Sequence, residues 1–126
     1  MNIALWILQI LLAALYLFHG WLMISPPPEV AAIMNTFLPT WFRLLIGVTE
    51  LFAAVGLILP GLTRILPWLT AAAAAGLMIV MASATVVHLS RSETSSAISA
   101  FVIFLLVTFV AYMRWKVKPI AARATV

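Results

Sequence analysis

Four long apolar segments divide the chain, and short polar or proline-containing stretches separate them. The segments cover residues 3–24, 41–59, 68–89 and 97–115. Each is close to the ~20 helical residues that cross a hydrocarbon core of about 30 Å. The pattern predicts an all-α fold, a membrane-spanning up-down-up-down four-helix bundle that forms one domain over residues 1–126.

The connection at residues 25–40 has a helical pattern of its own. Three prolines end the first span, because proline cannot continue the hydrogen-bonded ladder of a helix. Apolar residues then recur at helical spacing up to Pro39, and they are Val30, Ile33, Met34, Phe37 and Leu38. We expect a short amphipathic helix over residues 29–38 that lies at the membrane interface between the first and second spans. Such a helix serves either as a connector or as a gate.

Composition supports the membrane assignment. Hydrophobic residues make up 66% of the chain and charged residues 8%, and the mean hydropathy is +1.22. Soluble domains carry roughly 25% charged residues. Tryptophan prefers the membrane interface, and all five tryptophans lie near predicted span ends: Trp6, Trp21, Trp41, Trp68 and Trp115. The sequence therefore predicts an integral membrane protein in contact with the lipid bilayer.

The distribution of Lys and Arg predicts the orientation. Four spans place both termini and the connection between the second and third spans on one side. That side holds five basic residues, Arg64, Arg114, Lys116, Lys118 and Arg123, whereas the other side holds Arg43 and Arg91. The positive-inside rule then places both termini in the cytoplasm. We expect the cluster Arg114, Lys116 and Lys118 to meet anionic lipid, and no basic face or motif indicates nucleic-acid binding.

Glu50 is the most informative single residue, because it lies at the midpoint of an apolar span. A charged side chain there costs roughly 2.5 to 3.5 kcal/mol on insertion scales. It therefore faces a bundle interior, pairs with another group or becomes protonated. Arg43, Gly47 and Ala54 share its helical face at intervals of three and four residues.

The first and third spans carry further polar positions. Gln9, Tyr16 and His19 fall on one arc of the first helix beside small residues, which indicates a protein-facing side. Helical side chains lean toward their own N-terminus, so His19 and Glu50, on antiparallel helices, lean toward each other. We expect these two residues to form a polar centre with Tyr16, with Arg43 above it.

The third span contributes two further expectations. His88 continues a stripe with Met81 and Thr85, and it is the last residue that we assign to the candidate polar centre. Ala72 and Gly76 form a small-xxx-small pattern that predicts close helix packing.

Several chemistries are disfavoured by what the sequence lacks. The chain has no cysteine, so it cannot form disulfides, thiolate metal sites or thiol nucleophiles. No zinc-ligand spacing is present, so we assign no metal site. His19 and His88 could in principle ligate haem, but their unequal depth disfavours an axial pair. Any catalysis would need a bound cofactor or a partner.

One stretch resembles a known family, the DoxX-like membrane proteins. It reads Arg43-Leu-Leu-Ile-Gly47-Val-Thr-Glu50-Leu-Phe-Ala-Ala-Val-Gly56-Leu-Ile-Leu-Pro60, and Pro67-Trp68, the alanine-rich third span and His88-Leu89 follow it. The resemblance marks Arg43, Gly47, Glu50, Gly56 and Pro60, and it implies a structural role for Gly47, Gly56 and Pro60. It implies a small four-helix protein of the bacterial inner membrane. Some relatives look like subunits of quinone-linked oxidoreductases or partners in redox-defence complexes, and distant ones are linked to receptor assembly.

Two functional hypotheses follow. In the first, the chain is a ligand-binding or accessory subunit of a quinone-linked redox system, and its polar centre holds the head group of a quinone or another amphiphile. In the alternative, it is a non-catalytic assembly partner of other membrane proteins, or of a second copy of itself, and Glu50 is an internal anchor. A proton-coupled carrier is disfavoured, because no pair of broken helices is present.

Overall fold

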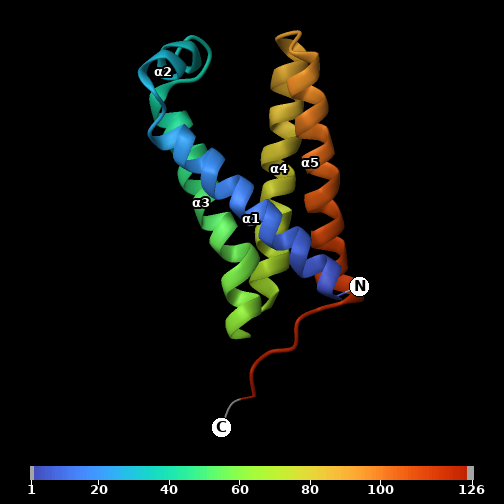
Figure 1. The fold of residues 1–126 in the computed structure, drawn as a ribbon. Helices are drawn as coiled ribbons and strands as arrows, with labels where there is room; N and C mark the ends of the chain where they lie inside the picture. The colour runs from blue at the N-terminus through green and yellow to red at the C-terminus, as the bar shows by residue number, and fades with distance from the viewer. Residues whose placement is uncertain (1, 125–126) are drawn as a thin grey trace.

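The computed structural model describes residues 2–124 and is helical throughout its regular structure (Figure 1). The helices are α1 (Asn2–Ile24), α2 (Pro28–Met34), α3 (Thr40–Thr63), α4 (Trp68–Ser90) and α5 (Thr94–Tyr112), and α5 continues into a π-helical turn, η1 (Met113–Val117). Four of them, α1, α3, α4 and α5 with η1, are long and apolar enough to cross a membrane. The predicted all-α fold with four spans is confirmed.

The helices are arranged as two antiparallel pairs. α1 packs along α3 and α4 packs along α5, while α3 and α4 join the two pairs. We call the first pair the α1/α3 arm and the second the α4/α5 arm. α1 meets α5 over a short stretch near the chain termini. The arms diverge toward the end that carries α2, so the bundle is closed at one end and open at the other (Figure 1).

The connection between α1 and α3 differs from its prediction. Pro27 is the N-cap and Pro28 the first residue of α2, as their fixed backbone angles favour. The helix ends at Met34, however, and not at residue 38. Pro39 is the N-cap of α3, and it disfavours helical geometry at Leu38 before it. The residues between Met34 and Pro39 therefore form turns.

α3 continues past its predicted end. We expected the second span to stop at Leu59, yet the helix runs through Pro60 to Thr63. Proline removes one helical hydrogen bond, which a membrane helix tolerates where neighbouring helices compensate. Arg64, in the left-handed conformation with φ of 59°, ends the helix.

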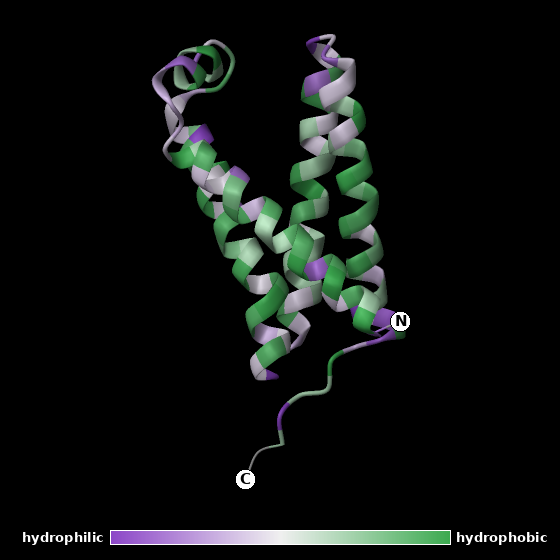
Figure 2. Ribbon diagram, viewed as in Figure 1, coloured by the Kyte–Doolittle hydropathy of each residue, from purple (hydrophilic) through white to green (hydrophobic). Residues whose placement is uncertain are grey.

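Alanine and leucine dominate the interior where the arms meet. The fully buried residues of this interior include Leu57, Ala74, Leu77, Val107 and Val110. The outer surface is also apolar, with large exposed side chains on every span. Hydrophobic residues make up most of each spanning helix (Figure 2). A soluble protein would bury such side chains, whereas a membrane protein turns them toward lipid.

The packing face of α4 corrects one prediction. Ala72 and Gly76 are exposed, and a Cβ added at Gly76 would meet no atom within 4 Å. The buried face carries Ala71, Ala74 and Leu77 instead. Five consecutive alanines give no hydrophobic contrast, so the sequence cannot indicate which of them face inward.

α1 and α3 approach each other closely at their glycines. A Cβ at Gly20 would lie 3.0 Å from the carbonyl oxygen of Gly47, and a Cβ at Gly47 would lie 2.8 Å from that of Gly20. Side-chain atoms of Met23 and Ile24 also come within 3.0 Å of a Cβ at Gly47. Glycine is thus required at both positions for the backbones to touch.

The Gly47→Ala variant should therefore be less stable than the parent protein. The added methyl group would force α1 and α3 apart, which typically costs about 1 to 3 kcal/mol. Gly76→Ala is the matched control, because the same methyl group there meets nothing. Thermal unfolding in detergent measures both variants. Equal melting temperatures for Gly47→Ala and the parent protein would show that the helices do not approach this closely.

Candidate functional site

Glu50 lies on the buried face of α3. Its side chain is 1% exposed, and Arg43, Gly47 and Ala54 on the same face are buried as well. The predicted inward stripe is therefore what the structure shows. A carboxylate at this depth, about 15 Å from the start of α3, is removed from both water and lipid.

His19 of α1 pairs with this carboxylate. Its Nδ1 lies 2.7 Å from Glu50 Oε2, and with Glu50 ionised the Nδ1–H group donates to that oxygen. The helix contact at Gly20 and Gly47 brings the two elements close enough for the pair to form. The side chain of His19 is 45% exposed, so the pair has one buried end and one accessible end.

Two polar atoms beside this pair have no partner among residues 2–124. They are Glu50 Oε1 and the hydroxyl oxygen of Tyr16, and both are fully buried. Tyr16 is 2% exposed and precedes His19 by about one turn of α1. Buried polar groups in native proteins are nearly always hydrogen-bonded, so each such atom requires an explanation. A ligand head group would supply the missing bonds.

Arg43 does not reach the centre, because helical side chains lean toward their own N-terminus, which for Arg43 on α3 is the direction away from Glu50. Its Nη1 donates to the carbonyl oxygen of Met23, one of the last carbonyls of α1. The described part of the chain has no ion pair between Arg43 and Glu50. Arg43 instead fastens the end of α1 to α3.

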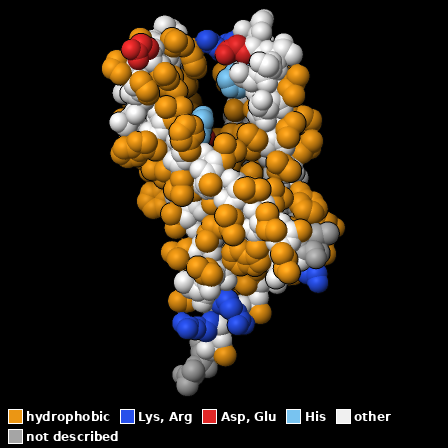
Figure 3. Space-filling model, viewed as in Figure 1, with side chains coloured by type: hydrophobic (Ala, Val, Ile, Leu, Met, Phe, Trp, Pro, Cys, Tyr) orange, Lys and Arg blue, Asp and Glu red, His pale blue; other side chains and the backbone are white. Residues whose placement is uncertain are grey.

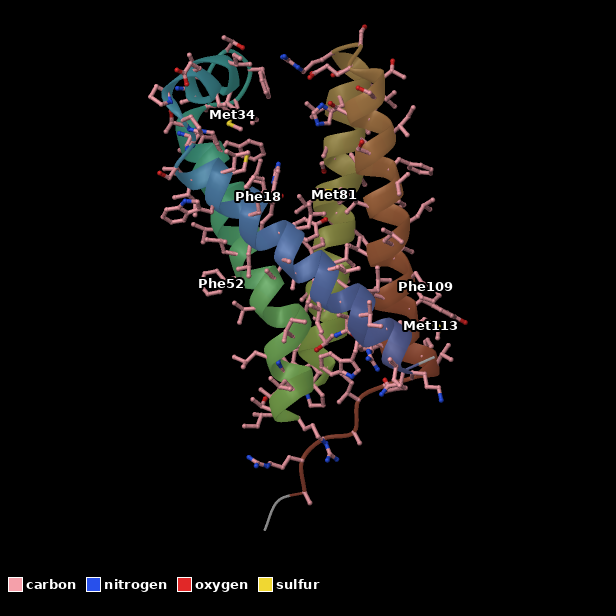
Figure 4. The ribbon with its side chains drawn as sticks, in the orientation of Figure 1. Phe18, Met34, Phe52, Met81, Phe109 and Met113 are labelled. Carbon is pink, nitrogen blue, oxygen red and sulfur yellow. The ribbon has the colours of Figure 1, made fainter. Side chains whose placement is uncertain are left out.

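The accessible end of the His19–Glu50 pair borders a hollow between the two arms. Figure 3 shows this hollow at the α2 end of the molecule, with a histidine side chain on each arm. In Figure 4, Met34 of α2 and Met81 of α4 lie on opposite sides of the gap, while Phe52 and Phe109 point away from the bundle. We call this hollow the cleft.

His88 belongs to a different cluster on the far side of the cleft. Its Nδ1 lies 3.7 Å from Glu93 Oε1, and Glu93 also pairs with Arg91. The Arg91 guanidinium holds the pKa of Glu93 below its ordinary value, which keeps this carboxylate ionised at neutral pH. Arg91 in turn lies over the ring of Phe37, 3.8 Å from its centre. This cation–π contact connects the α2–α3 turn with the α4–α5 turn across the mouth of the cleft.

A second polar cluster, which the sequence analysis missed, lies at the closed end. Arg114 is 4% exposed and donates from Nε to Gln9 Oε1 at 2.6 Å and from Nη1 to Asn2 Oδ1 at 2.7 Å. Gln9 Nε2 donates to the carbonyl oxygen of Leu57 at 2.6 Å. We expected Arg114 to meet lipid beside Lys116 and Lys118. Its Nε and Nη1 instead tie α5 to α1 and, through Gln9, to α3, while its Nη2 has no partner among residues 2–124. Its spacing from Val107 and Val110 could have indicated this inward face.

Comparison with known proteins identifies the family. The family model of the DoxX-like family matches residues 7–111, which is most of the chain. No curated protein and no solved structure matches it. The matched region includes α3 with Glu50, His19 of α1 and His88 of α4. The chain therefore belongs to the DoxX-like family of membrane proteins.

Proposed function

We propose that this DoxX-like protein binds the polar head group of a membrane amphiphile, such as a quinone, in the cleft. In this proposal it is an accessory subunit of a quinone-linked redox system, as some relatives look to be. The observation that carries the proposal is the pair of buried, unpartnered oxygens, Glu50 Oε1 and the Tyr16 hydroxyl, beside a half-exposed His19.

The donors and acceptors of the centre complement both states of a quinone. A quinone carbonyl accepts a hydrogen bond, which the Tyr16 hydroxyl supplies. A hydroquinone hydroxyl donates one, which Glu50 Oε1 accepts. Apolar side chains of the diverging arms surround the polar centre and suit the hydrocarbon tail. The same groups could also serve any amphiphile with a carbonyl or hydroxyl head.

The His19–Glu50 pair adds a proton-transfer route. Reduction of a quinone to a hydroquinone takes up electrons and protons in equal number, and oxidation releases them. The electrons come from a separate redox partner in this proposal. Protons pass between the bound head group and Glu50, and from there to the accessible imidazole of His19, because hydrogen-bonded groups exchange protons readily.

We further propose that the chain forms one domain in the bacterial inner membrane with both termini in the cytoplasm. The closed end of the bundle, which carries the termini, holds five basic and no acidic residues. In Figure 3, Lys and Arg side chains gather at that end. The asymmetry supports the orientation by the positive-inside rule.

Labelling of introduced cysteines tests the orientation, since the parent chain has none. A cysteine at Ala124 should stay unreactive toward a membrane-impermeant maleimide added to intact spheroplasts. A cysteine at Asn35 should react, because α2 and its turn lie at the opposite end. The reverse labelling pattern would show that the termini face outward.

The Tyr16→Phe variant separates a ligand site from a structural anchor. The hydroxyl has no partner in the described protein, so its removal should leave the melting temperature unchanged or higher. If the hydroxyl contacts a head group, the Kd for a short-tailed benzoquinone should rise about two- to tenfold. Titration calorimetry in detergent measures the Kd, and differential scanning fluorimetry measures stability.

The Glu50→Gln variant tests the carboxylate in the same assays. Loss of a charged acceptor should weaken quinone binding by about tenfold or more. Glu29→Gln is the matched control, because it removes one charge from an exposed residue of α2. Unchanged affinity in both Tyr16→Phe and Glu50→Gln would reject the cleft as the binding site. Parent protein that binds no quinone but co-purifies with another membrane protein would favour the assembly function instead.

A further inference from the structure

A groove of about 540 Å³ runs between α4 and α5 on the membrane-facing surface. The groove is hollow because alanine side chains are too small to fill the space between the two helices. The alanines that line it are Ala71, Ala72, Ala75 and Ala111. Trp115 and Lys116 border the end of the groove that lies nearest the chain termini. The volume falls within the range of about 300 to 1,000 Å³ that is typical of small-molecule sites.

A second hollow, of about 270 Å³, shares Trp115 with the groove in its lining. Trp68, Ile120 and Arg114 contribute to its lining. Arg114 is 4% exposed, and its Nη2 has no hydrogen-bond partner within residues 2–124. Its other two guanidinium nitrogens are bonded to Gln9, Asn2 and the carbonyl oxygen of Lys118. A buried cationic donor therefore lines a hollow at the polar end of an apolar groove.

We propose that an anionic phospholipid of the bilayer occupies these two hollows. An acyl chain lies in the alanine-lined groove, and the phosphate lies between Lys116 and Arg114. Tryptophans at the level of the head groups, Trp68 and Trp115, flank the phosphate. This site lies at the closed end of the bundle, away from the cleft, so it does not depend on the proposed quinone site.

Charge favours a lipid over a second copy of the chain in this groove. An alanine-lined surface can also pack against another helix. The closed end, however, holds five basic and no acidic residues, and a self-contact there would bring like charges together. An anionic head group neutralises the same charges. Juxtamembrane Lys and Arg attract anionic lipid.

Native mass spectrometry with defined lipids tests the proposal. Purified protein is delipidated and mixed with phosphatidylglycerol or phosphatidylcholine of the same acyl chains. The parent protein should retain phosphatidylglycerol in preference to phosphatidylcholine. Lys116→Gln should lower phosphatidylglycerol retention about fivefold more than Lys118→Gln does, because only Lys116 lines the groove. Lys118→Gln is the matched control, because it removes the same charge from a side chain that does not line the groove.

A second pair of variants tests the acyl-chain groove. Ala75→Leu places a large side chain in the groove and should reduce phosphatidylglycerol retention. Ala82→Leu makes the same change at an exposed position of α4 outside the groove and should have no effect. Circular dichroism verifies that each variant remains helical.

Three results would overturn the proposal. Equal retention of the two lipids by the parent protein would show that the site does not recognise an anionic head group. Equal losses in Lys116→Gln and Lys118→Gln would mean that surface charge acts diffusely, without a site. A dimer that forms without added lipid and that Ala75→Leu dissociates would assign the groove to a second copy of the chain.

Discussion

The backbone contact between α1 and α3 at Gly20 and Gly47 determines the rest of the structure. Without side chains at these positions, the two helices touch. The contact brings the His19 imidazole to the Glu50 carboxylate one helical turn away, and it brings the Arg43 guanidinium to the last turn of α1. The hydrogen bonds that His19 and Arg43 make therefore lie within the α1/α3 arm. The other arm, α4 with α5, supplies neither of these partners.

The two ends of the bundle differ because their polar bonds connect different helices. At the closed end, Arg114 links α5 to α1, and Gln9 links α1 to α3, so the two arms are held together. At the open end the corresponding bonds stay within the α1/α3 arm. The contact across the gap there is the exposed stacking of Arg91 on Phe37. Exposed cation–π contacts contribute about 0.5 to 1 kcal/mol, so this one is weaker than the buried bonds of the closed end.

The sequence predicted the helices and the inward side of α3, because one charged residue in an apolar span has a strong energetic preference. Glu50 fixed the orientation of α3, and the lean of helical side chains then predicted its partner His19. The orientation of α4 could not be predicted in the same way, since alanine has no comparable preference for either side. The inward hydrogen bonds of Arg114 were missed for a related reason. Near a span end, an arginine can reach either the lipid head groups or the protein interior, and the choice depends on Gln9, 105 positions away in the chain.

Unpartnered polar atoms occur at both ends of the molecule and lie close to hollows. At the open end they include Glu50 Oε1 and the Tyr16 hydroxyl, beside the cleft, as well as Arg43 Nε and His88 Nδ1. At the closed end Arg114 Nη2 belongs to a residue that lines a pocket. Water satisfies such atoms at the surface of a soluble protein, but a bilayer core offers none. The polar ends of amphiphiles can satisfy them where the protein meets a leaflet. The two ends differ in charge balance, because the open end carries acidic as well as basic residues, whereas the closed end carries basic residues alone. The acceptor and the hydroxyl beside the cleft suit a neutral head group, and the unneutralised cations at the closed end suit an anionic one. The two proposed sites would therefore select different lipid-soluble molecules from opposite leaflets.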